Sequence, residues 1–271
     1  MINLPENYNI DDYDRPSVAT DIAVFTIRKN PSESYRHLSE MKFSVLMIKR
    51  KDEPYKDFLS LPGGFTVRTE TIEQTAKRKL YEKTGVKDVP ISLLYNSSAM
   101  GRDPRGWIIS CAYWTLVESS QTALTEENAS WYDVKFTYGE ESILELFSDE
   151  GKYYRVVFHV SGNTELYNEA VKIETIENNC IAFDHAEIIA RAIIQLRNSL
   201  VYPYPAFRLL PESFTLTQLQ QVYESILDTP LLMANFRRKI SPYVQETGEI
   251  EAGAGHRPSK LFKPVFSKER K

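Results

Sequence analysis

Short runs rich in apolar, β-branched and aromatic residues dominate the first 165 residues, and polar stretches separate them. Runs of this length and composition are typical of β-strands. We expect strands at 20–27, 43–48, 107–117, 153–160 and 170–176, with a polar hairpin connection at 28–42. A helix at residues 71–84 lies among them. The pattern therefore predicts a fold of the α+β or α/β class, an α/β/α sandwich around a mixed sheet.

The pattern changes at residue 184, where apolar residues begin to recur at helical spacing. The recurring residues are Ile189, Ala192, Ile193, Leu196 and Leu200. Asp184 is a candidate N-cap for this helix, with an acidic residue, Glu187, three positions later. His185 in the first turn is either a ligand or, more commonly for such a position, a plain helix-terminus residue. We therefore divide the chain into residues 1–183 and 184–271.

Two more helices are predicted further along. Thr215 and Gln218 form a capping box at the start of the first. After a short turn, Pro230 suits the first position of the second helix, which extends over 231–240. Within it, Phe236 should pack inward together with Ile240, four residues later. The side chains expected to face solvent are Asn235, Arg238 and Lys239, with Arg237 at the margin.

A helix, a short turn and a basic helix form the helix-turn-helix arrangement, whose second helix enters the major groove of DNA. Strands at 244–251 and 260–266 pair across the basic tip at 253–258 as a wing. We expect the wing to contact the DNA backbone through His256, Arg257 and Lys260. In isolation, the basic helix is also compatible with an ordinary solvated face.

The composition limits the class of protein and the compartment in which it is expected. The chain has 271 residues, of which 42% are hydrophobic and 26% charged, as in soluble proteins with up to two domains. Its apolar runs are far shorter than a membrane span, and its acidic, polar N-terminus is not a secretory signal. Cys111 and Cys180 are the only cysteines, which excludes a disulfide framework. We expect a cytoplasmic protein with no membrane partner.

Charge is unevenly distributed, although the net charge is only −4. Residues 184–271 hold 12 basic and 9 acidic side chains, and residues 231–271 hold 9 basic and 4 acidic ones. The remaining part, 1–183, holds 21 basic and 28 acidic side chains. An acidic body with a basic end favours DNA binding by the C-terminal part.

The most informative motif is GFTVRTETIEQTAKRKLYEKTGV at 64–86. It follows Leu61-Pro62-Gly63, and glycines there let the backbone approach a phosphate closely. The spacing resembles the Nudix box of pyrophosphohydrolases, in which neighbouring helix positions hold magnesium through glutamates. The corresponding residues here are Gly64, Glu70, Arg78, Lys79, Glu82 and Lys83.

Two of the three glutamates at the metal end of the box are replaced, by Lys79 and Lys83. An ammonium about 5 Å from Mg²⁺ is repelled by roughly 6 to 7 kcal/mol at an effective dielectric of about 20. A flexible lysine can swing away, but the lost ligands are not recovered. We expect no intact catalytic site and no required cofactor. Only Glu70 and Glu82 remain for any residual magnesium binding, with Arg78 orienting one of them.

The segments AFDHAEIIARAIIQLRNSL, LLPESFTLTQLQQVYESIL and NFRRKI, together with the altered box, resemble the Nudix-related transcriptional regulators of the NrtR type. The resemblance covers nearly the whole chain. It implies a homodimeric repressor whose Nudix domain senses a small molecule, often ADP-ribose, and whose winged helix binds a palindromic operator of NAD-metabolism genes. Related members sense sugars and control sugar catabolism instead.

The resemblance also indicates an effector site. Arg102 and Arg105 lie in an RDPR segment like that of the family, and arginine matches phosphate geometry. The alternative is a structural loop with an ion pair to Asp103. The expected effector-binding residues are Gly63, Gly64, Lys79, Lys83, Arg102 and Arg105. Trp131 either stacks on a base or fills the core, and we favour the core.

Two other functions are compatible with the sequence. One is an active Nudix hydrolase, an ADP-ribose or nucleotide-sugar pyrophosphatase whose C-terminal domain only dimerises it. The incomplete acid triad, of which Glu82 alone remains, argues against this. The other is a non-enzymatic adaptor, which would leave Arg238 and Lys239 without DNA contacts.

Overall fold

The structure is a computed structural model that describes residues 8–30, 40–162, 171–251 and 258–266. One mixed sheet has the strand order β10-β9-β8-β7-β2-β1-β6-β5, with β3 paired to β2 and β4 to β1. β1 is parallel to β6, whereas the other named pairs are antiparallel. The strands are β1 (Ser17–Asn30), β2 (Glu40–Lys49), β3 (Leu59–Ser60), β4 (Gly63–Phe65), β5 (Ser92–Ser97), β6 (Ile108–Leu116), β7 (Ala129–Thr137), β8 (Ser142–Phe147), β9 (Tyr153–Ser161) and β10 (Lys172–Glu177).

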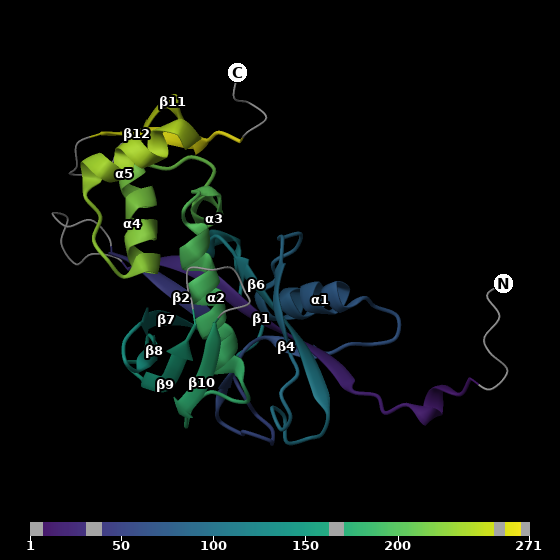
Figure 1. Cartoon of the computed structure of the whole chain (residues 1–271). Helices are drawn as coiled ribbons and strands as arrows, with labels where there is room; N and C mark the ends of the chain where they lie inside the picture. Colours follow the sequence, from purple (N-terminus) through teal and green to yellow (C-terminus); the bar gives the residue numbers. More distant parts are fainter. Residues whose placement is uncertain (1–7, 31–39, 163–170, 252–257, 267–271) are drawn as a thin grey trace.

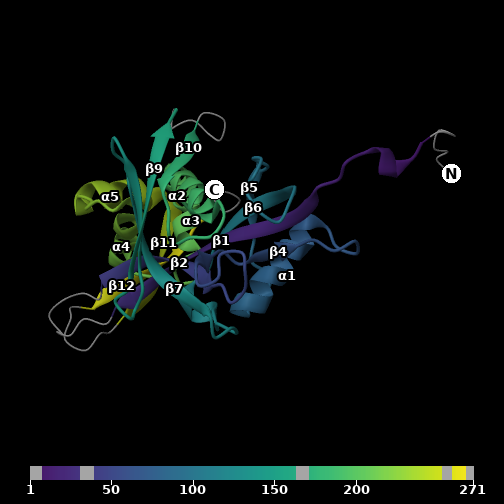
Figure 2. The same ribbon diagram turned by 90° about the horizontal axis from the view of Figure 1, so that it is seen from below.

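Helices cover both faces of this sheet (Figures 1 and 2). Along β1, Ile22 and Val24 join the core under α1, whereas Ala23 and Phe25 join the core under α2 and α4. Successive residues of a strand point to opposite faces, so β1 is apolar on both. The helices are α1 (Ile72–Thr84), α2 (His185–Ser199), α3 (Tyr204–Phe207), α4 (Leu216–Leu227) and α5 (Met233–Ile240). The predicted sandwich is confirmed.

The box helix, α1, begins and ends as the sequence predicts. The hydroxyl of Thr71 accepts the backbone N–H of Gln74, and the side chain of Gln74 accepts the N–H of Thr71. Gly85 ends the helix with a φ of 68°, a left-handed conformation that glycine adopts at little cost. The metal end of the box, positions 79 to 83, therefore lies on the last turns of a regular helix.

Helix α2 starts at the expected place, but the prediction that Asp184 caps it was wrong. The Asp184 side chain makes no capping hydrogen bond. Its carboxylate instead accepts hydrogen bonds from Arg102 and Ser97. The guanidinium of Arg102 donates to both oxygens of this carboxylate, and such a bidentate pair between two charged groups holds it away from the backbone N–H groups of the first turn.

The C-terminal part is a winged helix domain, as predicted. The hydroxyl of Thr215 accepts the N–H of Gln218 in a capping box that starts α4. Beyond α5, strands β11 (Val244–Glu251) and β12 (Ser259–Pro264) form an antiparallel wing. Backbone hydrogen bonds between Phe214 and Phe262 attach the wing to the residue before the capping box.

The predicted start of α5 was wrong by two residues, because the helix begins at Met233 and Pro230 lies before it in the turn. Two side chains of α4 hold Leu231 in that turn. The carboxylate of Glu224 accepts the Leu231 N–H at 2.8 Å, and the amide of Gln220 donates to the Leu231 carbonyl at 3.0 Å. These bonds satisfy the backbone outside a helix, so α5 starts later.

The two parts share one apolar core. The cluster that begins in β1 and β2 continues through α2 and α4 to Phe236 and Ile240 of α5. Arg197 of α2 donates to the carbonyls of Ile226 in α4 and Phe136 in β7. Helix α2 therefore packs on the sheet and also supports the winged helix. Among the described residues, no helix is long and apolar enough to cross a membrane.

Candidate effector site and DNA-binding face

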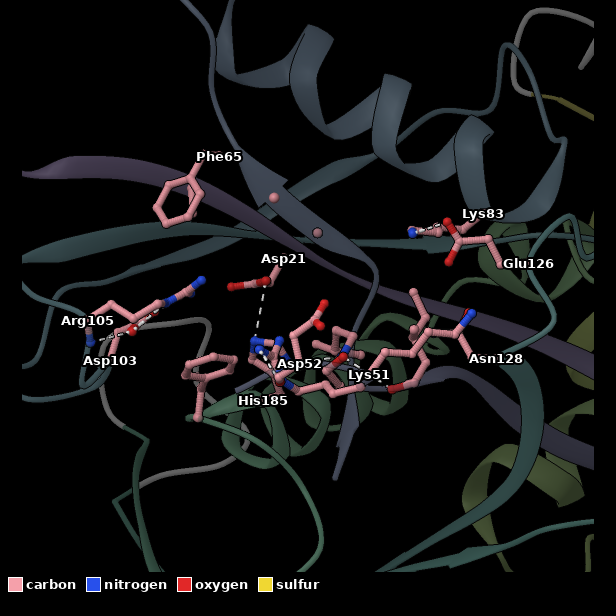
Figure 3. A pocket seen from close by; sticks show the side chains of 18 of the residues that line it. Asp21, Lys51, Asp52, Phe65, Lys83, Asp103, Arg105, Glu126, Asn128 and His185 are labelled. Atoms are coloured by element: carbon pink, nitrogen blue, oxygen red, sulfur yellow. Dashed lines mark hydrogen bonds and ion pairs between the residues drawn. The ribbon is translucent and has the colours of Figure 1, made fainter. Parts of the chain in front are cut away.

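A cavity of about 670 Å³ opens at one end of the sheet, beside the last turn of α1 and the start of α2. Figure 3 shows Asp21 and His185 between Arg105 on one side and Lys83 on the other. Five of the six predicted effector-binding residues line it: Gly63, Gly64, Lys83, Arg102 and Arg105. Lys79 is not among the described residues that line it.

The floor of the cavity is a buried carboxylate with its donors. The Nε2 of His185 lies 3.3 Å from Asp21, while its Nδ1 accepts the N–H of Leu61 at 2.9 Å. Ser110 donates to the same carboxylate at 2.6 Å. Burial alone would raise the pKa of Asp21, but His185, Ser110 and the charge of Arg102 outweigh it and lower the pKa to about 2. The floor therefore carries a fixed negative charge.

Arg102 lies behind this floor, and its charge is already matched. Its guanidinium donates to Asp184 at 2.5 and 2.9 Å and lies 3.5 Å from Asp21. Only 4% of its side chain is exposed. The alternative to an effector contact was a structural ion pair with Asp103. Arg102 does form a structural ion pair, but its partner is Asp184. Its contact with pyrophosphate stays a prediction.

Arg105 has the opposite character, because 43% of its side chain is exposed. Asp103 accepts from its guanidinium at 2.6 and 2.9 Å and fixes its plane. The guanidinium carbon lies 5.1 Å from the ring centre of Phe65 and 5.2 Å from that of Phe183. Arg105 is therefore held in one orientation while part of it still faces the cavity.

Four charged residues of the box form a network of hydrogen bonds with one another: Glu70, Arg78, Lys79 and Glu82. Arg78 donates to both oxygens of Glu70 at 2.8 and 2.9 Å and to Glu82 at 2.9 Å. The second oxygen of Glu82 accepts from Lys79 at 2.8 Å. Arg78 was predicted to orient Glu70 or Glu82, and it hydrogen-bonds both. The hydrogen bond from Arg78 is the largest effect on the pKa of Glu70 and lowers it.

The two glycines before α1, Gly63 and Gly64, pack closely against other parts of the protein. A Cβ on Gly63 would lie 2.3 Å from the carbonyl oxygen of Thr20 and 2.4 Å from a carboxylate oxygen of Asp21. A Cβ on Gly64 would lie 2.7 Å from the Cε of Lys79. Close packing against the backbone of β1 thus requires glycine at position 63, whereas at position 64 the flexible end of Lys79 could move aside.

The solvent face of α5 carries the predicted polar residues. Phe236 and Ile240 are buried, while Asn235, Arg237 and Arg238 are exposed. Lys239 is exposed too, but its ammonium donates to the carbonyl of Leu200, 3.3 Å away at the end of α2, and lies over the ring of Tyr223.

The wing carries both signs of charge. Lys260 on β12 pairs with Glu246 on β11, with Nζ–Oε distances of 2.9 and 3.1 Å. Two of the predicted wing contacts, His256 and Arg257, lie outside the described residues. Arg237 and Arg238 therefore carry the strongest case for DNA contacts.

Known protein families match both the N-terminal and the C-terminal part of the chain. The model of the NUDIX domain matches residues 36–154, and that of the NrtR DNA-binding winged helix domain matches residues 206–263. The chain thus combines a NUDIX domain with a winged helix domain like that of NrtR. The "ADPR responsive transcriptional repressor NtrR" of Acinetobacter baylyi is 28% identical over 260 residues, which cover 94% of this chain and 85% of the relative.

Solved structures support the same NrtR-type architecture. Crystal structures of Shewanella oneidensis NrtR, alone and complexed with a 27mer DNA, each have 25% identity and a TM-score of 0.62. They match 92% of this chain and 94% and 93% of the respective NrtR chains. A MutT/nudix family protein from Enterococcus faecalis, at 22% identity, shares the fold with a TM-score of 0.68 over 97% of this chain and 90% of that one.

Magnesium, which the Nudix family implies, does not fit the donors of this NrtR-type chain. Glu70 and Glu82 already accept hydrogen bonds from Arg78 and Lys79. Lys83 forms an ion pair with Glu126, so an ammonium occupies the corner where a third carboxylate would be needed. The part of the chain that the structure describes has no group of three or more His, Cys, Asp or Glu residues able to hold a metal ion.

Several residues of the site were missed by the sequence reasoning. Asp21 interrupts an apolar strand, and a carboxylate in such a run is a usable signal of a buried polar network. Arg50, directly after β2, and Phe183, before the N-cap residue of α2, also line the cavity without any motif to mark them. Trp131 is half-buried against the core under α1, which agrees with the favoured core position.

Proposed function

We propose that this chain is a DNA-binding transcriptional repressor whose affinity for its operator depends on a nucleotide effector, ADP-ribose or a closely related compound. The cavity beside α1 and α2 binds the effector, and the exposed face of α5 binds DNA. One observation carries the proposal: α2 touches the cavity at its first residue, His185, and the winged helix at its last turn, through Arg197.

The comparisons support the ligand classes. The relative from Acinetobacter baylyi is described as ADPR responsive, and Shewanella oneidensis NrtR has been crystallised with DNA. We further propose a homodimer on a palindromic operator upstream of NAD-metabolism genes, because helix-turn-helix readers match the two-fold symmetry of their sites. Effector binding without magnesium is part of the proposal, since Arg78 and Lys79 already pair with the box carboxylates that remain, Glu70 and Glu82.

A gel-shift experiment with DNA from upstream of the protein's own gene tests this function. We expect a complex at low salt that ADP-ribose dissociates, both with and without EDTA. A pentose sugar, added at the same concentrations, tests the effector class found among the related sugar regulators. Arg238→Ala should weaken the complex, whereas Arg155→Ala, on the surface of β9, should leave it intact. Absence of any complex at low salt would refute DNA binding.

The competing hydrolase function has a separate measurement. Release of AMP from ADP-ribose at ordinary enzyme rates, in the presence of magnesium, would show that the lysines in the box are tolerated by catalysis. We expect no such turnover.

A further inference from the structure

Two guanidinium groups approach one phenyl ring at the cavity wall. The guanidinium carbon of Arg50 lies 4.9 Å from the ring centre of Phe183, and that of Arg105 lies 5.2 Å from the same centre. Arg50 follows β2, Arg105 precedes β6 and Phe183 precedes α2, so three separate parts of the fold meet here. All three residues line the cavity.

The charge of Arg50 is left without a carboxylate partner among the described residues. Its hydrogen bonds go to the backbone carbonyls of Pro54, at 2.8 Å, and Asp52, at 3.3 Å. Arg102 and Arg105, in contrast, each pair with a carboxylate. Burial and then the neighbouring charge of Arg105 lower the pKa of Arg50. The charges of Asp103, Asp52 and Glu53 act in the opposite direction, but none of these carboxylates forms an ion pair with Arg50 in the described structure, so its guanidinium is available to an anion.

Phe183 is fixed in an unusual backbone conformation. Its φ is 55°, in the left-handed region that bulky residues rarely adopt. Such strain persists where surrounding contacts determine it, and it is found mostly at ligand sites. Here the ring also meets Tyr55 edge-on, with centroids 4.9 Å apart, and lies 5.2 Å from the imidazole of His185. The ring that both arginines contact is therefore held in place.

We propose that Arg50 and Arg105, which both contact the Phe183 ring, form the binding site for the diphosphate group of the effector. Arginine binds phosphate oxygens through two parallel N–H groups, and two arginines match a group that carries two phosphates. The identity of the whole ligand as a nucleoside diphosphate sugar rests on the proposed function. The diphosphate contact itself rests on Arg50, Arg105 and Phe183.

Calorimetry on the full chain tests this site with two probes, ADP-ribose and inorganic pyrophosphate. Arg50→Ala should weaken binding of both by about 10- to 100-fold, because charge-assisted hydrogen bonds are lost. Arg50→Lys keeps the charge but loses the planar fork, so we expect an intermediate loss. Arg155→Ala is the matched control, since Arg155 pairs with Glu177 outside the cavity. Thermal melting establishes that each variant is folded.

The two probes separate this inference from the proposed function. If wild-type protein binds pyrophosphate and Arg50→Ala does not, the diphosphate site stands even where ADP-ribose is not the effector. If a folded Arg50→Ala binds ADP-ribose as wild type does, the site is refuted while the proposed function survives. Failure of wild type to bind either probe would overturn the diphosphate site as well.

Discussion

Asp21 shows how single residues in the cavity are tuned. Its pKa of about 2 in the folded protein lies below its ordinary value of 3.8. A lowered pKa stabilises the fold above pH 4, and this contribution is lost as the pH falls toward 2. The shift corresponds to about 2 kcal/mol.

Urea unfolding of wild type and Asp21→Asn between pH 2 and 7 tests this value. Wild type should be the more stable protein near neutral pH, and its advantage should shrink by about 2 kcal/mol as the pH falls from 4 to 2. Comparing the two proteins removes the contribution of the other carboxylates, which titrate in both. A constant difference across this range would contradict the assigned network around Asp21.

Phe183 offers a second test at the residue scale. Glycine adopts a φ of 55° freely, whereas alanine at this angle is strained by about 1 kcal/mol or more. We therefore expect Phe183→Gly to be more stable than Phe183→Ala by about that amount, the reverse of the usual order. Chemical denaturation of both variants measures the difference. Equal stability, or a more stable alanine variant, would show that the backbone relaxes once the ring is gone.

The sequence revealed residues of the site only where they belong to a motif. Arg78 and Glu82 follow from local helical spacing and Glu70 from the spacing of the box, and in the structure the three side chains hydrogen-bond to one another through Arg78. Asp21 and His185 are far apart in the chain and meet only because β1 and α2 pack together. No local pattern encodes such a pair, so tertiary packing had to be known first.

At the scale of elements, the face of α5 separates two kinds of basic residue. Arg237 and Arg238 are exposed, whereas the ammonium of Lys239 donates to the end of α2. Each phosphate contact contributes about 0.9 to the slope of log affinity against log salt. We expect Arg237→Ala and Arg238→Ala each to lower the slope by about this amount, and Lys239→Ala to change it much less. Gel shifts at several salt concentrations measure it, and an equal loss for Lys239→Ala would reassign that residue to DNA.

Helix α2 has a role that Arg197 makes testable. This residue connects α2 to α4 and β7 through two backbone carbonyls. Arg197→Ala should cost about 1.5–3 kcal/mol of stability, because hydrogen bonds from a charged donor are lost. We expect ADP-ribose to bind the variant normally in calorimetry but to release DNA less effectively in gel shifts. Normal release of DNA would exclude Arg197 from the coupling between the two sites.

Elements with strong local signals were predicted well, and those that depend on partners were not. The capping boxes of α1 and α4 are short-range hydrogen-bond patterns, which sequence spacing determines. Strands β5, β7 and β8 were not predicted, because their backbone groups gain partners only from neighbouring strands. The start of α5 was misplaced for a similar reason, since the side chains of Glu224 and Gln220 hold Leu231 outside the helix.

At the scale of the whole molecule, the continuous core predicts how the protein unfolds. One apolar cluster extends from Phe25 in β1 through Ile193 in α2 to Ile240 in α5. Arg208 adds a further connection, donating from the end of α3 to the carbonyls of Pro90 and Leu116. Separating the winged helix would expose this cluster on both sides, so neither part should be stable while the other is unfolded.

Differential scanning calorimetry of the full chain tests this expectation. We expect one transition whose calorimetric and van't Hoff enthalpies agree, as for a single cooperative unit. ADP-ribose should raise the midpoint of the whole transition, because a ligand that binds only the folded state stabilises everything that unfolds with it. Circular dichroism and tryptophan fluorescence should report the same midpoint. Two separate transitions, only one of which shifts with ADP-ribose, would contradict a single cooperative unit. The effector site would then have to affect the DNA-binding face by another route than a shared core.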